Sequence, residues 1–247
     1  MKPVFDLKKI KFAVDAPTFE RAVALYESGK VTDVEEFNGN YHALVLGTKP
    51  YHVNVPGRDF RRGDCNCYLG ERNVVCKHIV ALALYAVAGG QPLNDEDKQL
   101  NTEVKCGGIQ ADISKEELAR AKKSVSEAMR SIKPYHGPSS TWFRNQDSLA
   151  EGCNRLSEIV SAFPVNQQTA DVLVKLLLRL DKKLCTGGVD DSNGIVGGFM
   201  SEVVEMLKEY AKIERGCVKA FRQLAGRRTC FDWEASLVRI VDEQIDQ

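Results

Sequence analysis

A short segment with three cysteines and one histidine constrains the fold of this chain more than any other feature. Cys65 and Cys67 form a Cys-x-Cys pair, and Cys76 and His78 form a Cys-x-His pair at the start of an apolar run. A structural zinc ion takes four tetrahedral ligands from thiolate and imidazole groups. The spacer of residues 68–75 is long enough to fold back and bring both pairs to one ion. We therefore predict one structural zinc ion, with no coordination position left open for catalysis.

The remaining cysteines lack this spacing. The chain has eight cysteines in all, a number that would suggest disulfides in a secreted protein. The amino-terminal sequence MKPVFDLKKIKF has no apolar segment typical of a secretory signal. We therefore expect reduced thiols and a cytoplasmic location. Four cysteines fall on or near helical stripes and are expected to be core residues rather than a second metal or redox site: Cys153, Cys185, Cys217 and Cys230.

Before the cysteine segment, the pattern predicts one helix and three short strands. Asp15 is a suitable helix cap, and apolar residues then recur at helical spacing until Gly29. The pair Asn38-Gly39 favours a tight turn between strands at residues 31–37 and 41–46, and residues 51–55 alternate as a third strand. Residues 56–75 are expected to be a loop. Residues 77–88 are apolar nearly all round, which predicts a buried helix that ends at Gly89-Gly90.

The second half of the chain is predicted to be helical. Residues 91–112 are polar and aperiodic, which indicates a linker. Ser114 and Glu117 have the spacing of a capping box, and the helix that they open carries an apolar stripe as far as Ile132. We expect a loop at residues 135–146, and further helices at 147–163, 168–184, 198–213, 216–225 and 232–244. The fold class is therefore α+β, with a small zinc-binding unit followed by an all-α domain.

The C-x-C-x8-C-x-H pattern before an apolar helix resembles the SWIM zinc finger. Residues 19–31, which contain a helix and a Gly-x-Val entry, and the strand at residues 51–53 resemble the flanks of prokaryotic stand-alone members. Ala22 stands where many relatives have glycine. The resemblance covers about residues 15–90. With the patterns above, it predicts a SWIM domain at 1–90, a linker at 91–113 and a helical domain at 114–247. It also implies a non-catalytic module that binds DNA or proteins.

Five basic residues near the ligands are candidates for contacts with nucleic-acid phosphates: Arg58, Arg61, Arg62, Arg72 and Lys77. The alternative is a solvated loop, because Asp59, Asp64 and Glu71 are interleaved with them. Lysine and arginine together number 34, as do aspartate and glutamate. This balance gives no global electrostatic argument for a nucleic-acid partner.

We expect a non-enzymatic module that binds nucleic acid, DNA in the first place, or acts in a DNA-associated complex. The alternative is a protein-interaction adaptor in which the zinc is purely structural. An enzyme with a helical pocket around His136, Trp142 and Arg144 is the third hypothesis. No small-molecule substrate is expected. The most apolar stretches, residues 79–88 and 172–180, are shorter than the ~20 residues that a membrane span requires, so no membrane association is expected.

Overall fold

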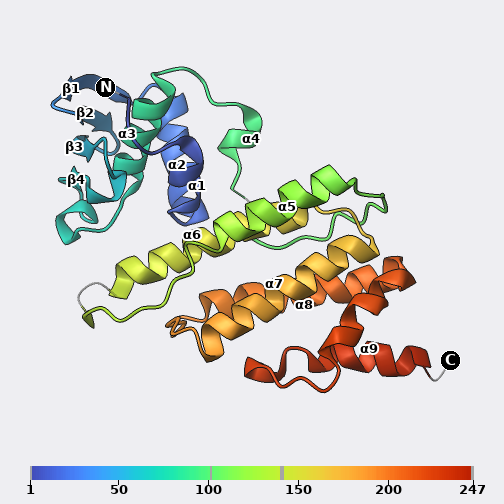
Figure 1. The fold of residues 1–247 in the computed structure, drawn as a ribbon. Helices are drawn as coiled ribbons and strands as arrows, with labels where there is room; N and C mark the ends of the chain where they lie inside the picture. Colours follow the sequence, from blue (N-terminus) through green and yellow to red (C-terminus); the bar gives the residue numbers. More distant parts are fainter. Residues whose placement is uncertain (1, 101, 140–141, 246–247) are drawn as a thin grey trace. The chain divides into compact units, whose positions relative to one another are not determined.

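The computed structural model divides the chain into two compact units, Met1–Leu100 and Asn101–Gln247 (Figure 1). It describes residues 2–100, 102–139 and 142–245, without the side chains of 144, 244 and 245. The first unit combines strands and helices and the second is helical, which confirms the α+β class. Each unit has its own hydrophobic core, and each is described by itself.

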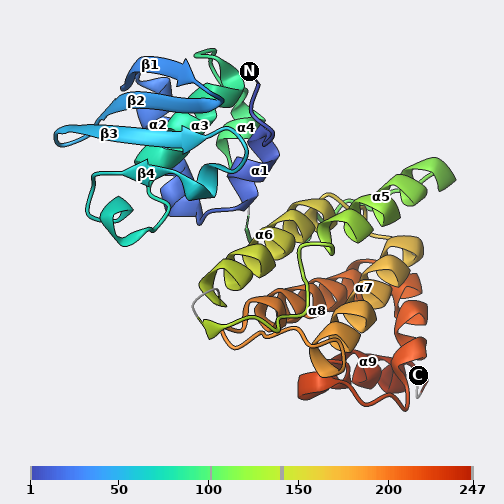
Figure 2. The same ribbon diagram turned by 60° about the vertical axis from the view of Figure 1, so that its left-hand side comes forward.

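An antiparallel sheet with the order β1-β2-β3-β4 forms one layer of the N-terminal unit (Figure 2). The turn between the first two strands confirms the prediction from Asn38-Gly39, because both residues have positive φ angles (51° and 74°). A fourth, two-residue strand lies in the segment that we expected to be only loop. The strands are β1 Val31–Phe37, β2 Asn40–Leu46, β3 Pro50–Pro56 and β4 Asp64–Cys65.

Helix α3, Lys77–Ala88, covers one face of this sheet and has the predicted bounds. Seven of its twelve residues are buried, and Gly89 ends it with a φ of 62°. Helix α2, Ala16–Glu27, packs against α3, and its cap is Asp15, as predicted. The other helices of this unit, α1 Leu7–Phe12 and α4 Asp95–Lys98, were not predicted. Their short length gives too little periodicity to detect.

The predicted linker is divided between the two units. Leu93 and Leu100 are buried in the N-terminal core, and the Leu93 amide donates to Glu27 at 2.9 Å. Val104 and Cys106 pack against the core of the C-terminal unit. The polar residues of this segment therefore lie between a few apolar residues that pack against the two cores. These apolar residues are too few to give a periodic pattern in the sequence.

The C-terminal unit is a set of packed helices. Its first helix confirms the predicted capping box, because Ser114 and Glu117 each accept from the other's backbone amide. The predicted leucine stripe is also found, with Leu173, Leu176 and Leu177 almost fully buried. The α-helices are α5 Lys115–Ala128, α6 Trp142–Ser161, α7 Gln167–Cys185, α8 Ile195–Ile213 and α9 Ala235–Ile245.

Several predicted boundaries in this unit are wrong. Helix α6 begins at Trp142, inside the expected loop, and the Trp142 indole donates to Asp190 at 3.0 Å. Helix α8 begins at Ile195, ahead of the predicted start at residue 198. The segment η4, Arg215–Leu224, is a 3-10 helix. The Trp142–Asp190 contact at the start of α6 joins segments 48 residues apart, so local pattern does not show it. At the start of α8, the amides of Val196 and Gly197 donate to the Asp191 carboxylate.

The cysteines of the C-terminal unit follow the prediction only in part. Cys153 and Cys217 are buried core residues, as expected. For Cys185 and Cys230 the prediction was wrong: Cys185 is exposed, Cys230 is half-buried, and the two form a disulfide with Cα atoms 6.2 Å apart. This disulfide joins the end of α7 to the short 3-10 helix η5, Cys230–Asp232.

Among the residues that the structure describes, none of the helices combines the length and the hydrophobicity that crossing a lipid bilayer requires.

Candidate metal centre

Two local structures carry the four predicted ligands. Cys65 ends strand β4 and Cys67 follows two residues later, whereas Cys76 is the N-cap of α3 and His78 lies in its first turn. The loop between the pairs turns back over Cys65 at Gly70. A Cβ atom at Gly70 would lie 2.0 Å from the Cys65 carbonyl oxygen, so only glycine fits there. The register of β3 with β4, which pairs Val53 with Cys65, fixes the first ligand relative to the sheet.

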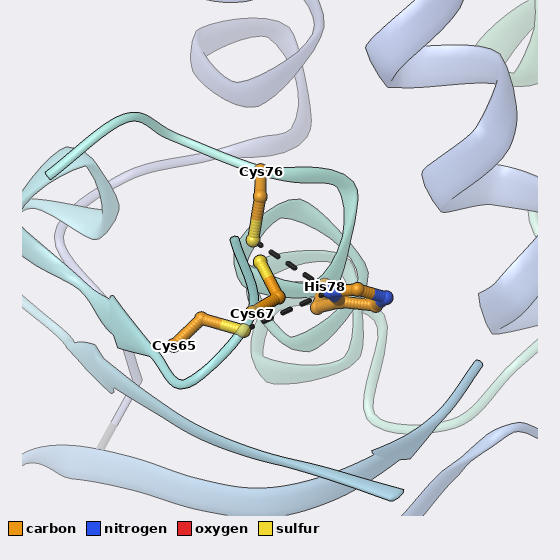
Figure 3. Close-up of side chains that lie close together, drawn as sticks. All are labelled: Cys65, Cys67, Cys76 and His78. Carbon is orange, nitrogen blue, oxygen red and sulfur yellow. Dashed lines mark hydrogen bonds between the residues drawn. The ribbon is translucent and has the colours of Figure 1, made fainter. Parts of the chain in front are cut away.

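The four side chains point toward one another (Figure 3). Their ligand atoms all lie within 4.8 Å of each other, and all four residues are buried. The Sγ atoms of Cys65 and Cys76 lie 3.7 and 3.8 Å from His78 Nδ1. Zinc–sulfur and zinc–nitrogen bonds of about 2.3 and 2.0 Å in a tetrahedron require separations of about 3.5–3.8 Å between ligand atoms. The donor set and its spacing therefore fit a zinc ion.

The thiols of this centre are electrostatically linked. Hydrogen bonds, first from the Cys65 thiol and then from His78, together lower the pKa of Cys76 to about 4 against the effect of burial. The same bond, together with burial, raises the pKa of Cys65. The Gly70 amide donates to Cys67 Sγ at 3.4 Å. At least one thiolate is thus favoured before a metal ion adds its charge, and thiolate is the form that binds zinc.

The histidine ring is positioned by stacking. The ring of Tyr51 lies 4.3 Å from that of His78 at an interplanar angle of 23°. His78 Nε2 is buried and has no hydrogen-bond partner among the described residues. A Cβ atom at Gly47 would lie 3.2 Å from Nε2 and 2.9 Å from the Tyr51 ring. Zinc-bound histidines usually donate their second ring nitrogen to an acceptor, so at this centre aromatic packing takes that orienting role.

Comparison with protein families matches residues 51–86 to the SWIM zinc finger. The match begins at Tyr51, which packs on the ligand His78, and ends inside α3. The chain carries a SWIM zinc finger. Its four ligands, Cys65, Cys67, Cys76 and His78, form a buried zinc site. No curated protein and no solved structure matches the chain significantly.

The arginines of the SWIM finger differ in what they contact. Arg61 forms an ion pair with Asp59 at 3.0 Å, and Arg62 lies 3.9 Å from the same carboxylate. Although burial opposes it, the hydrogen bonds and charge of Arg61 hold the pKa of Asp59 below its ordinary value. Arg72 stacks on the Tyr68 ring at 3.6 Å and donates to the Tyr68 carbonyl oxygen at 2.9 Å. Arg58 is exposed.

The fifth candidate, Lys77, is half-buried between the ligands Cys76 and His78. This position suits a positive charge that offsets the thiolates.

An exposed apolar cluster on the finger was not predicted from the sequence. Tyr68, Leu69 and Val74 are 69%, 42% and 47% exposed. They lie in one loop, where the Val74 amide donates to the Leu69 carbonyl oxygen at 3.1 Å. We name Tyr68, Leu69, Arg72 and Val74 the loop tip. In the sequence this segment looks like any loop with a few apolar residues. Only the folded structure shows that these residues are exposed together.

Among the described residues, the other candidates do not form a comparable centre. Asp181, Cys185 and Cys230 bring three ligand-type atoms together, but the two sulfurs are joined in the disulfide. His136 is exposed, and the Trp142 indole is bonded to Asp190. The Arg144 side chain lies outside the described residues.

Proposed function

We propose that this protein is a non-enzymatic adaptor that uses its SWIM finger to present the loop tip to a protein partner. The zinc ion is structural in this proposal, because four protein ligands complete a tetrahedron and leave no position at the metal for a substrate.

The exposed loop tip is the observation that carries the proposal. Tyr68 and Leu69 expose apolar surface on a loop that the zinc ligands hold from both sides, Cys67 before it and Cys76 after it. Tyrosine and arginine are the residue types that dominate the binding energy of protein interfaces, and here Arg72 stacks on Tyr68. A loop held in place in advance also loses less conformational entropy on binding.

Nucleic acid is the second candidate partner, because Arg58 and Arg62 are exposed on the finger. Two observations favour a protein partner over nucleic acid. The net charge of the chain is zero, and non-specific affinity for nucleic acid depends on the number of phosphates that a protein neutralises. Arg61 is already paired with a carboxylate.

The test is quantitative copurification of the full chain from its own cells, after nuclease treatment. We compare the wild-type protein with the Tyr68→Ala/Leu69→Ala variant. The matched control is Phe37→Ala, since Phe37 is an aromatic residue of the same unit with 68% exposure against 69% for Tyr68. Zinc content and thermal stability are measured for each variant to show that the finger remains folded.

A protein that copurifies with the wild type and the control, and that is lost at least tenfold from the double variant, supports the proposal. If nuclease treatment abolishes the copurification, nucleic acid becomes the favoured partner. In that case Arg58→Ala/Arg62→Ala should weaken DNA binding, and the affinity should fall steeply with salt. Equal recovery of the partner by the double variant and the wild type would overturn the role of the loop tip.

A further inference from the structure

We propose that the open face of the finger's sheet binds a lysine- or arginine-bearing segment of the protein partner. This inference rests on the proposed function and adds the chemistry of the partner to it. Helix α3 packs on one face of the sheet. In Figure 2 the helices of the N-terminal unit lie behind the strands, and the opposite face of the sheet carries none of them.

The strand register places a polar row across this open face. Glu35 of β1 pairs with His42 of β2, His42 pairs with Asn54 of β3, and Asn54 pairs with Asp64 of β4. Paired residues share a face of a sheet, so all four side chains lie on the side opposite α3. The row forms the floor of a hollow of about 670 Å³, and Gly70, Glu71 and Asn73 of the zinc loop also line it.

The charge of the hollow is of one sign. Its lining includes four carboxylates, two histidines (His42 and His52) and no lysine or arginine; the carboxylates are those of Asp33, Glu35, Asp64 and Glu71. All four residues are exposed. In a chain whose formal net charge is zero, this is a local excess of negative charge. A concave surface lined by one sign of charge raises the local concentration of opposite charges.

The polar groups between the carboxylates suit an occupant that donates hydrogen bonds. The Asn54 amide nitrogen donates to Asp64 at 3.2 Å, which leaves Asn54 Oδ1 as a buried acceptor without a partner among the described residues. Ammonium and guanidinium groups carry donors only. The volume lies within the range of ligand pockets, about 300–1,000 Å³, and exceeds what one such group fills. A segment with several basic residues therefore fits better than a single cation.

The loop that the zinc ligands hold contributes residues to both the hollow and the loop tip. Gly70, Glu71 and Asn73 line the hollow, whereas Tyr68, Leu69, Arg72 and Val74 form the loop tip. A partner can thus place an apolar anchor at the tip and a basic segment in the hollow. The carboxylates would also repel phosphates, which favours a protein over a nucleic acid at this face.

The experiment uses the purified full chain loaded with zinc and a fluorescent nine-residue peptide of alternating lysine and threonine. Binding is followed by anisotropy at low salt and by chemical-shift changes of the backbone amides. The test variant is Glu35→Gln/Glu71→Gln, which removes one carboxylate from each side of the hollow. The control is Glu20→Gln/Glu96→Gln, an identical change of charge at exposed glutamates of the same unit outside the hollow lining.

We expect the test variant to bind the peptide about three- to tenfold more weakly, since each exposed ion pair contributes little. The control should stay within twofold of wild type, and a glutamate–threonine peptide should not bind. Shift changes should lie on β1–β4 and the zinc loop. Equal weakening of both variants, or shift changes elsewhere, would overturn the inference.

The two proposals fail separately. A cellular partner that needs the loop tip but binds the Glu35→Gln/Glu71→Gln variant as well as wild type leaves the proposed function standing and refutes the role of the hollow. If no partner depends on the loop tip, the proposed function fails, whatever the peptide shows.

Discussion

Removal of zinc should unfold the N-terminal unit and leave the C-terminal unit folded. Structural zinc contributes about 10–16 kcal/mol of apparent binding free energy in finger peptides, which is as large as the whole stability of a typical domain, about 5–15 kcal/mol. The ligands lie in the core of the first unit, and the core of the second unit contains none of them. His78→Ala, or chelation of the wild type, is therefore expected to act on one unit only.

The structure gives the size of the expected signal. In the described residues, the α-helices of the N-terminal unit have 6, 12, 12 and 4 residues, and those of the C-terminal unit have 14, 20, 19, 19 and 11. Loss of the first set should remove roughly three tenths of the helical circular dichroism at 222 nm. Both tryptophans, Trp142 and Trp233, belong to the second unit, so tryptophan fluorescence should not change.

Both signals are recorded on the same sample, without a reducing agent, so that the disulfide stays intact. His52→Ala is the matched control, because His52 is an exposed histidine of the same unit, on strand β3 and outside the ligand set. This variant should keep one zinc ion per chain. A change of tryptophan emission on chelation would refute the independence of the two units. Unchanged circular dichroism after complete loss of zinc would refute the structural role of the ion.

Two further perturbations test details of the fold. Gly70→Ala should abolish stoichiometric zinc binding, measured by elemental analysis, because its Cβ would lie 2.0 Å from the Cys65 carbonyl oxygen, whereas Gly198→Ala, with nothing within 4 Å, should leave zinc bound. Retention of zinc by Gly70→Ala would contradict the described loop. The Cys185→Ser/Cys230→Ser variant should lower the free energy of unfolding of the C-terminal unit by up to about 4 kcal/mol, because the disulfide closes a loop with a sequence separation of 45. Urea unfolding followed by tryptophan fluorescence measures this loss, and a midpoint equal to that of the wild type would contradict it.

Local features of the sequence determined much of the fold and the whole ligand set. The apolar run at residues 77–88 became α3 with the predicted bounds, because a helix depends on neighbours three and four residues apart. The Asn38-Gly39 turn and the Ser114–Glu117 capping box are equally local, and the structure confirms both. The four zinc ligands were predictable because the prediction depends only on their residue types and their spacing in a short segment, and on no contact with distant parts of the chain.

Tertiary structure alone decided the features that join distant parts of the chain. Cys185 and Cys230 are separated by 45 positions, and nothing near either residue predicts their pairing. The register of four strands places Glu35 and Asp64 on one polar row, and a shift of one residue would have turned each side chain to the other face. The sequence therefore specified which side chains can hold the zinc ion. The surface that the zinc-held loop presents depends on how the chain packs, because it combines residues that are brought together only by folding.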